Sequence, residues 1–205
     1  QDLNSISADP RFASPTAATP DLHISAVLAT PVEGGGQSNA SVTDDYDGQT
    51  RSGLTPVDIG ADAGNFVAMD ISGPGISYTP VTAGCGTGNI ALTGVIITDA
   101  TGVPLAGSLV PRIYFRKAAG AWFSRPGTLA SGTANNSIWN FTIVVSDVGG
   151  IAAGDVISYY VIAQDNAAIP NIGSNPGGVV ATDVNTVTTH PALPNTLTVL
   201  VPLAG

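Results

Sequence analysis

Residues 44–62 read DDYDGQTRSGLTPVDIGAD, and this stretch separates two unlike parts of the chain. It contains the densest cluster of acidic residues in the sequence. The residues before it form short pieces broken by turn-forming residues, whereas those after it alternate between apolar and polar over strand-length runs. We therefore predict an all-β protein with two domains, residues 1–65 and residues 66–205.

The acidic stretch is predicted to contain a tight turn. Gly48 permits a positive φ angle, and the side chains of Asp45 and Asp47 can accept hydrogen bonds from nearby backbone amides. Arg51 and Asp58 lie on either side of a proline-containing turn and could form an ion pair across it. One interpretation of the stretch is therefore a solvated turn. In this interpretation Asp side chains cap the turn and one ion pair closes it.

A second interpretation of the same stretch is a cation site. Four of its carboxylates could supply oxygen ligands to Ca²⁺, which takes about six to eight of them. These ligands would be Asp45, Asp47, Asp58 and Asp62. An EF-hand is excluded, because no Glu follows at the spacing that motif needs. The sequence leaves the capped turn and the calcium site both open.

The amino-acid sequence of this region resembles that of a known family. Residues 45–51 (DYDGQTR) and 56–62 (PVDIGAD) resemble the closing motif of right-handed parallel β-helices in secreted and surface proteins of bacteria. Residues 8–12 (ADPRF) and 21–24 (DLHI) resemble the coil that precedes this closure in the same proteins. The resemblance covers roughly the first third of the chain and implies a β-helix-closing segment from an extracellular or cell-surface protein of bacteria.

Such a segment has too few coils to be stable alone. A solenoid usually needs about three stacked repeats, and this segment has room for about two partial ones. We therefore expect residues 1–65 to be stabilised by packing against the second domain, against further coils upstream or against another copy of the chain. Gln1 is compatible with a processed N-terminus and equally with a fragment boundary.

The composition narrows the possible partners. Charged residues make up 10% of the chain and hydrophobic residues 43%, which is typical of extracellular β-proteins. A net charge of −9 with six basic residues disfavours nucleic acid and anionic membrane surfaces. No apolar run is long enough to span a bilayer. Cys85 is the single cysteine; we expect a small packed side chain or, alternatively, an intermolecular disulfide.

The second part of the chain contains about seven expected strands. Residues 137–145 alternate cleanly, and Trp139, Phe141, Ile143 and Val145 are expected to face a core. Turn signals separate the strands and no helical period is convincing, so we predict an antiparallel β-sandwich. The strands are expected at residues 76–81, 89–98, 111–116, 121–124, 137–145, 156–164 and 195–203.

A second resemblance refines this prediction. Residues 153–165 (AGDVISYYVIAQD) resemble the penultimate strand of immunoglobulin-like and fibronectin type III-like modules in bacterial surface proteins. The resemblance implies an immunoglobulin-like sandwich, in which Tyr159 or Tyr160 acts as a tyrosine corner with its hydroxyl bonded to backbone. The cystine of antibody domains is absent.

The last expected strand allows two pairings. It is reached through a long and nearly uncharged connection, residues 177–191. It is either the last strand of its own sandwich or a strand that completes the sheet of a neighbouring subunit. Together with the incomplete coils, this favours a non-enzymatic extracellular structural subunit that assembles head-to-tail into a filament or a surface adhesin.

The alternative function is a carbohydrate-binding accessory module of a longer polysaccharide-degrading β-helix protein. Trp122, Trp139, Tyr114 and Phe123 would form its sugar platform, although aromatic residues at alternating strand positions more often belong to a core. Glycosylation sequons begin at Asn39, Asn135 and Asn140. His23 is expected to point outward from a strand. No residue is predicted to be catalytic.

Overall fold

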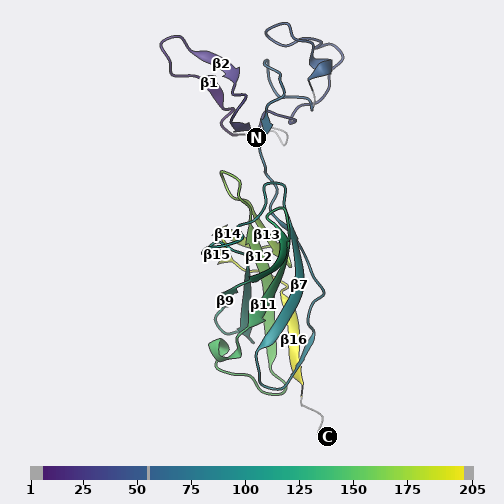
Figure 1. The fold of residues 1–205 in the computed structure, drawn as a ribbon, viewed down its shortest axis with the longest axis vertical. Helices are drawn as coiled ribbons and strands as arrows, with labels where there is room; N and C mark the ends of the chain where they lie inside the picture. Colours follow the sequence, from purple (N-terminus) through teal and green to yellow (C-terminus); the bar gives the residue numbers. More distant parts are fainter. Residues whose placement is uncertain (1–6, 55, 201–205) are drawn as a thin grey trace. The chain divides into compact units, whose positions relative to one another are not determined.

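The computed structural model describes residues 7–54 and 56–200 (Figure 1). The fold is all-β with mainly antiparallel sheets, which confirms the predicted class. The chain forms two compact units: unit 1 extends to Asp70 and unit 2 begins at Ile71. The domain boundary expected from the sequence was residue 65. Among the described residues, no helix has the length and apolar character needed to cross a membrane.

Unit 1 contains little regular structure. The antiparallel strands β1 (Phe12–Ser14) and β2 (Asp21–Ile24) form a hairpin, and β3 (Ala29–Thr30) pairs in parallel with β4 (Val67–Ala68). A 3₁₀ turn, η1, covers Arg51–Gly53. The parallel pairing of β3 with β4 brings the chain back alongside itself after the whole acidic stretch.

The core of unit 1 is small. Among its described residues, the buried apolar side chains are Ile24, Val32 and Ala63. Larger apolar side chains are exposed, including Val27 at 83%, Tyr46 at 81% and Leu22 at 59%. Burial of apolar surface is the dominant stabilising contribution to folding, so this unit draws little stability from its own interior.

Unit 2 is a sandwich of two sheets (Figure 1). One sheet has the strand order β10–β11–β7–β5, and the other has the order β6–β16–β12–β8–β9, with β13 also paired to β12. A separate hairpin consists of β14 and β15. The bounds are β5 Gly75–Ser77, β6 Ala83–Cys85, β7 Ile90–Thr98, β8 Arg112–Lys117, β9 Phe123–Pro126, β10 Thr128–Thr133, β11 Asn136–Ile143, β12 Val156–Gln164, β13 Ile172–Asn175, β14 Val180–Asp183, β15 Thr186–Thr189 and β16 Asn195–Leu200.

The main core lies between these two sheets. The predicted inward residues Trp139, Phe141 and Ile143 are all buried there, so the alternation of β11 was interpreted correctly. Val145 was expected to join them, but it begins the 3₁₀ turn η2 (Val145–Val148) and is only partly buried. The facing sheet contributes apolar residues from β8, β12 and β16.

Strand β12 is buried on both faces. Its second face, with Tyr160 and Ile162, packs against Tyr114 of β8 and Val184, and residues of the β14–β15 hairpin surround this cluster. The long connection expected at residues 177–191 contains this covering hairpin, for which no strands were predicted. The Asp183 side chain accepts a hydrogen bond from the Asn185 N–H (2.7 Å) in the turn between the two strands.

Two other strand predictions need correction. The strand expected at residues 76–81 is shorter: β5 beside β7 ends at Ser77, Pro80 follows, and the next strand, β6, begins at Ala83 and pairs with β16 in the other sheet. Proline has no N–H for a sheet ladder, which favours a break at this point. Strand β10 was missed and forms the hairpin with β11. Nothing is described of the Cys85 side chain.

The last strand belongs to its own sandwich. β16 pairs antiparallel with β12 and parallel with β6. The end of the strand expected at residues 201–203 lies outside the described residues. Tyr159 on β12 is fully buried, and its hydroxyl bonds the backbone N–H (2.7 Å) and C=O (3.0 Å) of Val81. Since Val81 is distant in sequence, this contact ties a remote segment to β12 and is not a local corner.

We predict that Phe141→Ala lowers the free energy of unfolding of unit 2 by about 3–5 kcal/mol, because it leaves a cavity in the main core. Thr142→Ala, at the exposed neighbouring position, is the control and should change it by less than about 0.5 kcal/mol. Both tryptophans lie in unit 2, so urea denaturation followed by tryptophan fluorescence measures this effect. Equal costs for the two variants would contradict the assigned core.

Candidate functional site

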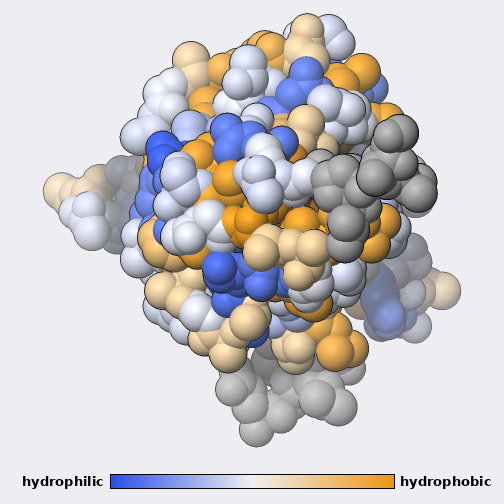
Figure 2. Space-filling view, turned by 90° about the horizontal axis from the view of Figure 1, so that it is seen from below, coloured by the Kyte–Doolittle hydropathy of each residue, from blue (hydrophilic) through white to orange (hydrophobic). Residues whose placement is uncertain are grey.

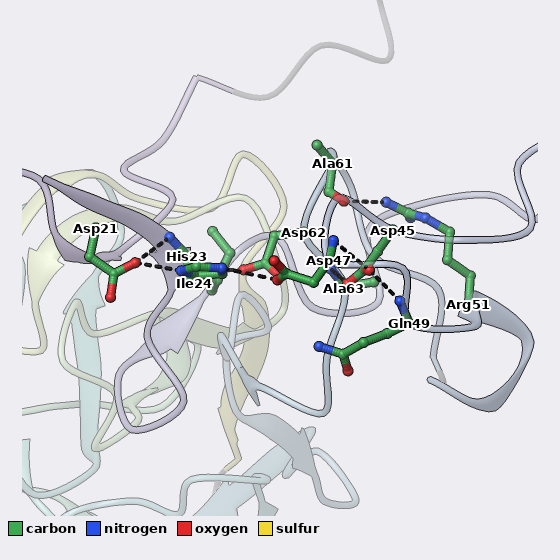
Figure 3. Close-up of polar contacts among 10 residues, drawn as sticks. All are labelled: Asp21, His23, Ile24, Asp45, Asp47, Gln49, Arg51, Ala61, Asp62 and Ala63. Carbon is green, nitrogen blue, oxygen red and sulfur yellow. Dashed lines mark hydrogen bonds and ion pairs between the residues drawn. The ribbon is translucent and has the colours of Figure 1, made fainter.

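The acidic turn of unit 1 is held by the carboxylate of Asp45 (Figure 3). Asp45 Oδ1 accepts hydrogen bonds from the N–H groups of Asp47 (2.9 Å) and Gln49 (2.7 Å). Its Oδ2 accepts a longer one from the Ala63 N–H (3.4 Å). Gly48 takes the positive φ of 78° that the turn requires. The capped-turn interpretation of the sequence therefore describes the observed contacts of Asp45.

Arg51 fixes the other side of the turn by binding carbonyl oxygens. Its guanidinium donates hydrogen bonds to the backbone oxygens of Gly60 and Ala61 (3.1 Å for Ala61). Its backbone N–H donates to the Thr43 oxygen (2.9 Å). The suggested ion pair of Arg51 with Asp58 is not among the salt bridges of the described residues.

Asp58 is buried, and it serves a separate part of the unit. It is 4% exposed; its Oδ1 accepts from the Gly34 N–H (3.1 Å) and its Oδ2 from the Gly64 N–H (2.9 Å). Next to it, the Gly36 N–H donates to the Val57 oxygen (2.8 Å), and a Cβ on Gly36 would collide with the Asp58 backbone. Asp58 therefore clamps two loops together.

Asp62 and His23 connect the β1–β2 hairpin to the acidic turn (Figure 3). Asp62 Oδ2 accepts a hydrogen bond from the Ile24 N–H (2.6 Å). The imidazole of His23 lies between two carboxylates, with Nδ1 at 2.5 Å from Asp21 Oδ1 and Nε2 at 3.0 Å from Asp47 Oδ2. No partner of His23 was predicted from the sequence, and only the Asp21-x-His23 spacing could have indicated one of these two carboxylates.

The two carboxylates change the titration of His23. The hydrogen bond with Asp21, together with the negative charge of Asp47, raises the pKa of His23 above its ordinary value. The same hydrogen bond lowers the pKa of Asp21. The side chains of His23, Asp21 and Asp47 are all substantially exposed. Solvent and salt therefore screen the attraction between His23 and the two carboxylates.

Three of the four residues suggested as calcium ligands lie together. Asp45, Asp47 and Asp62 each offer a carboxylate oxygen within 4.8 Å of the others, while Asp58 is not a member of this group. Asp45 and Asp62 already bind backbone N–H groups, and the carboxylate of Asp47 binds the His23 imidazole. Ca²⁺ would find three protein carboxylates here and would need about three or more further oxygen ligands.

Beside this cluster, unit 1 contains an open apolar hollow of about 880 Å³. Apolar side chains of the β1–β2 hairpin form part of its wall, and Tyr46 and Ile59 form another part. The carboxylates of Asp21 and Asp62 and the imidazole of His23 also line it. The hollow is therefore an apolar surface with acidic groups at its margin.

The four aromatic residues suggested as a sugar platform do not form one. Trp139 is in the main core, and Tyr114 is buried against Tyr160, with ring centroids 5.3 Å apart. Trp122 is half-buried, with the His190 ring stacked at 4.6 Å and the Arg116 guanidinium carbon at 4.6 Å from its centroid. Phe123 is 39% exposed at the edge strand β9. Most of these aromatic residues therefore pack against other side chains and do not form a shared exposed surface.

Neither the sequon residues nor the end of unit 2 near β16 forms a distinct cluster of functional side chains. Of the sequon residues, Asn135 donates to the backbone oxygens of Asp99 and Ala100, and Asn140 accepts from the Gly94 N–H. At the end of unit 2 near the end of β16, apolar residues are interspersed with hydrophilic ones (Figure 2). The acidic turn and the adjacent hollow are therefore the candidate site.

We predict that Asp58→Ala lowers the local stability of unit 1 by about 2–4 kcal/mol, because two backbone N–H groups lose their acceptor. Asp44→Ala, at an exposed carboxylate of the same turn, should cost less than about 0.5 kcal/mol. Hydrogen exchange of the Gly34 and Gly64 amides measures the loss. Unchanged protection of these amides in Asp58→Ala would show that the clamp is dispensable.

We predict that the two histidines titrate on opposite sides of their ordinary value of 6.5. The carboxylates raise the pKa of His23, whereas burial and then the charge of Arg116 lower the pKa of His190. The stabilisation from His23 is then fully present below pH 6.5 and is lost as the pH rises through its raised pKa. NMR titration assigns the two values, with His23→Gln identifying the signal; the reverse order would contradict the geometry.

The sequence matches no protein-family model, and the comparison with curated proteins also gives no match. The function must therefore be argued from the contacts of the two units.

Proposed function

We propose that this chain is a non-enzymatic, extracellular structural subunit that associates with identical subunits head-to-tail, as part of a filament or a surface adhesin. The observation that carries the proposal is the exposed apolar hollow of unit 1, beside a core with three buried apolar residues among its described residues. A unit of this kind gains stability when another surface covers it.

The small sheets of unit 1 lead to the same expectation. Its hairpin has two strands and its parallel pair has two residues in each strand. Two-stranded sheets are at best marginally stable in water, and three or more strands with a covered apolar face are needed for independent stability. A neighbouring copy would supply this cover through an interface that buries about 1,200–2,000 Å² in total, the size of a standard specific contact.

The acidic residues support a structural role. Asp45, Asp58 and Asp62 each bind backbone N–H groups from other segments, so their carboxylates maintain the path of the chain. Such a use explains the concentration of acids in this region without a substrate. It also makes the residues costly to replace whether or not Ca²⁺ binds beside them.

The strand order of unit 2 supports an immunoglobulin-like module, as many extracellular proteins contain. A four-stranded sheet faces a sheet with β8, β12 and β16 at its centre, and this agrees with the division of such sandwiches. The first strands, β5 and β6, are divided between the two sheets. Since β16 is already paired on both sides, we assign self-association to unit 1 and not to a donated last strand.

We predict that the purified chain forms larger species as its concentration rises, because each copy carries an exposed apolar hollow. Light scattering after size-exclusion chromatography, with electron microscopy of the concentrated sample, measures the assembly. Open-ended head-to-tail contacts should give chains of variable length, since they do not close. A monomer at every concentration, with residues 7–70 resistant to proteolysis, would contradict the proposal.

A further inference from the structure

The charges of the chain are divided unequally between the two units. Ten of the 15 acidic residues lie in residues 1–70, together with two of the six basic residues. Unit 2 has five acidic and four basic residues and is nearly neutral. The net charge of −9 therefore comes almost entirely from unit 1, which will attract a cationic surface.

The basic residues of unit 2 are concentrated on one hairpin. All four lie on the strands β8 and β9: Arg112, Arg116, Lys117 and Arg125. Lys117 is 3.6 Å from Asp155, and Arg125 forms a two-bond pair with Asp147 (2.6 and 2.7 Å). Among the described residues, no salt bridge includes Arg112 or Arg116. The hairpin therefore keeps a positive charge after its local pairs are counted.

The same hairpin also offers an apolar group at a free strand edge. β9 is the outermost strand of its sheet and pairs with β8. Phe123 is 39% exposed, and Arg125 lies two residues later, on the same face of the strand. The edge of unit 2 thus presents an exposed aromatic ring beside the Arg125–Asp147 pair, while Arg112 and Arg116, which have no salt bridge among the described residues, lie on the other face of the same hairpin.

The hollow of unit 1 has the complementary properties. Its wall includes the exposed apolar side chains of Leu22 (59%) and Ile59 (40%), and Asp21 and Asp62 stand at its margin. Apolar contact would supply most of the affinity, and the opposite charges would orient the approach. Two units of type 1 would instead repel one another, because both are acidic.

We propose that the β8–β9 hairpin of one copy docks at the acid-rimmed hollow of unit 1 in a second copy. This inference rests on the proposed head-to-tail association and assigns its two surfaces. Each copy contains this hollow and this hairpin on different units, so the contact is between unlike surfaces and can be repeated from copy to copy.

The first test is the dependence of association on salt. The Debye length falls from about 10 Å at 0.1 M to about 3 Å at 1 M salt, so attraction between the two charged surfaces is largely screened. Sedimentation velocity of the full chain, at several protein concentrations, should show an association constant at least roughly tenfold lower at the higher salt. Association that is unchanged or stronger in 1 M sodium chloride would overturn the assignment.

The second test uses matched variants of the hollow. Leu22→Lys places a cation on an exposed position of the hollow, and Val27→Lys places one on an exposed position of the same unit that does not line it. Both change the net charge equally. We expect Leu22→Lys to weaken association at least roughly tenfold and Val27→Lys to weaken it much less. Equal effects would exclude the hollow as the docking surface.

The third test uses one position of the hairpin with opposite charges. Ala119 is exposed in the turn between β8 and β9. Ala119→Glu should weaken association and Ala119→Lys should strengthen it, and a shared structural effect cannot produce opposite signs. If both Ala119 variants associate as strongly as the unchanged chain, the assigned surfaces are wrong, but head-to-tail association through other surfaces is not contradicted. A chain that is monomeric in every condition would overturn both.

Discussion

The backbone of unit 1 has few sheet partners, and aspartate carboxylates satisfy many of the amides that a ladder would otherwise bind. Buried backbone groups need hydrogen-bond partners, because an unpaired one loses its interaction with water and gains nothing. Asp58 provides two acceptors for loops that the sheets do not reach, and Asp45 closes the turn in the same way. These hydrogen bonds hold the path of the chain around the short strands β1–β4, but they stabilise local geometry and do not create a core.

Unit 2 is stabilised differently, by strand pairing and by buried apolar cores. Its long strands pair through continuous ladders, and two faces of β12 are covered by different layers. Tyr159 and Tyr160 are neighbours that point to opposite sides, one into the main core and one beneath the β14–β15 hairpin. The sandwich therefore has a large interior of its own, whereas the buried apolar side chains among the described residues of unit 1 are Ile24, Val32 and Ala63. This difference is why the proposed association is assigned to unit 1.

Local alternation was sufficient to predict most of the large strands, because a period of two determines which side chains face inward. It succeeded for Trp139, Phe141 and Ile143, and failed for Val145, because the strand ends at Ile143 and Val145 begins a 3₁₀ turn. It also missed the β14–β15 hairpin, whose four-residue strands are too short for a clear pattern. The acidic turn was found by its residue types, but the sequence could not separate Asp58 from the other three acids. That separation, like the approach of His23 to Asp47, depends on the path of loops between residues distant in sequence.

The use of carboxylates as clamps has a consequence for assembly. Each clamp adds a negative charge to a unit whose apolar hollow would otherwise attract any exposed apolar surface. Specificity depends on the difference between right and wrong contacts, and repulsion between like charges raises the free energy of the wrong ones. Two acidic units brought face to face must bring many carboxylates together, whereas a basic hairpin brings the opposite charge. The same residues that hold unit 1 in shape therefore bias the proposed assembly toward head-to-tail contacts and against symmetric pairing of two hollows.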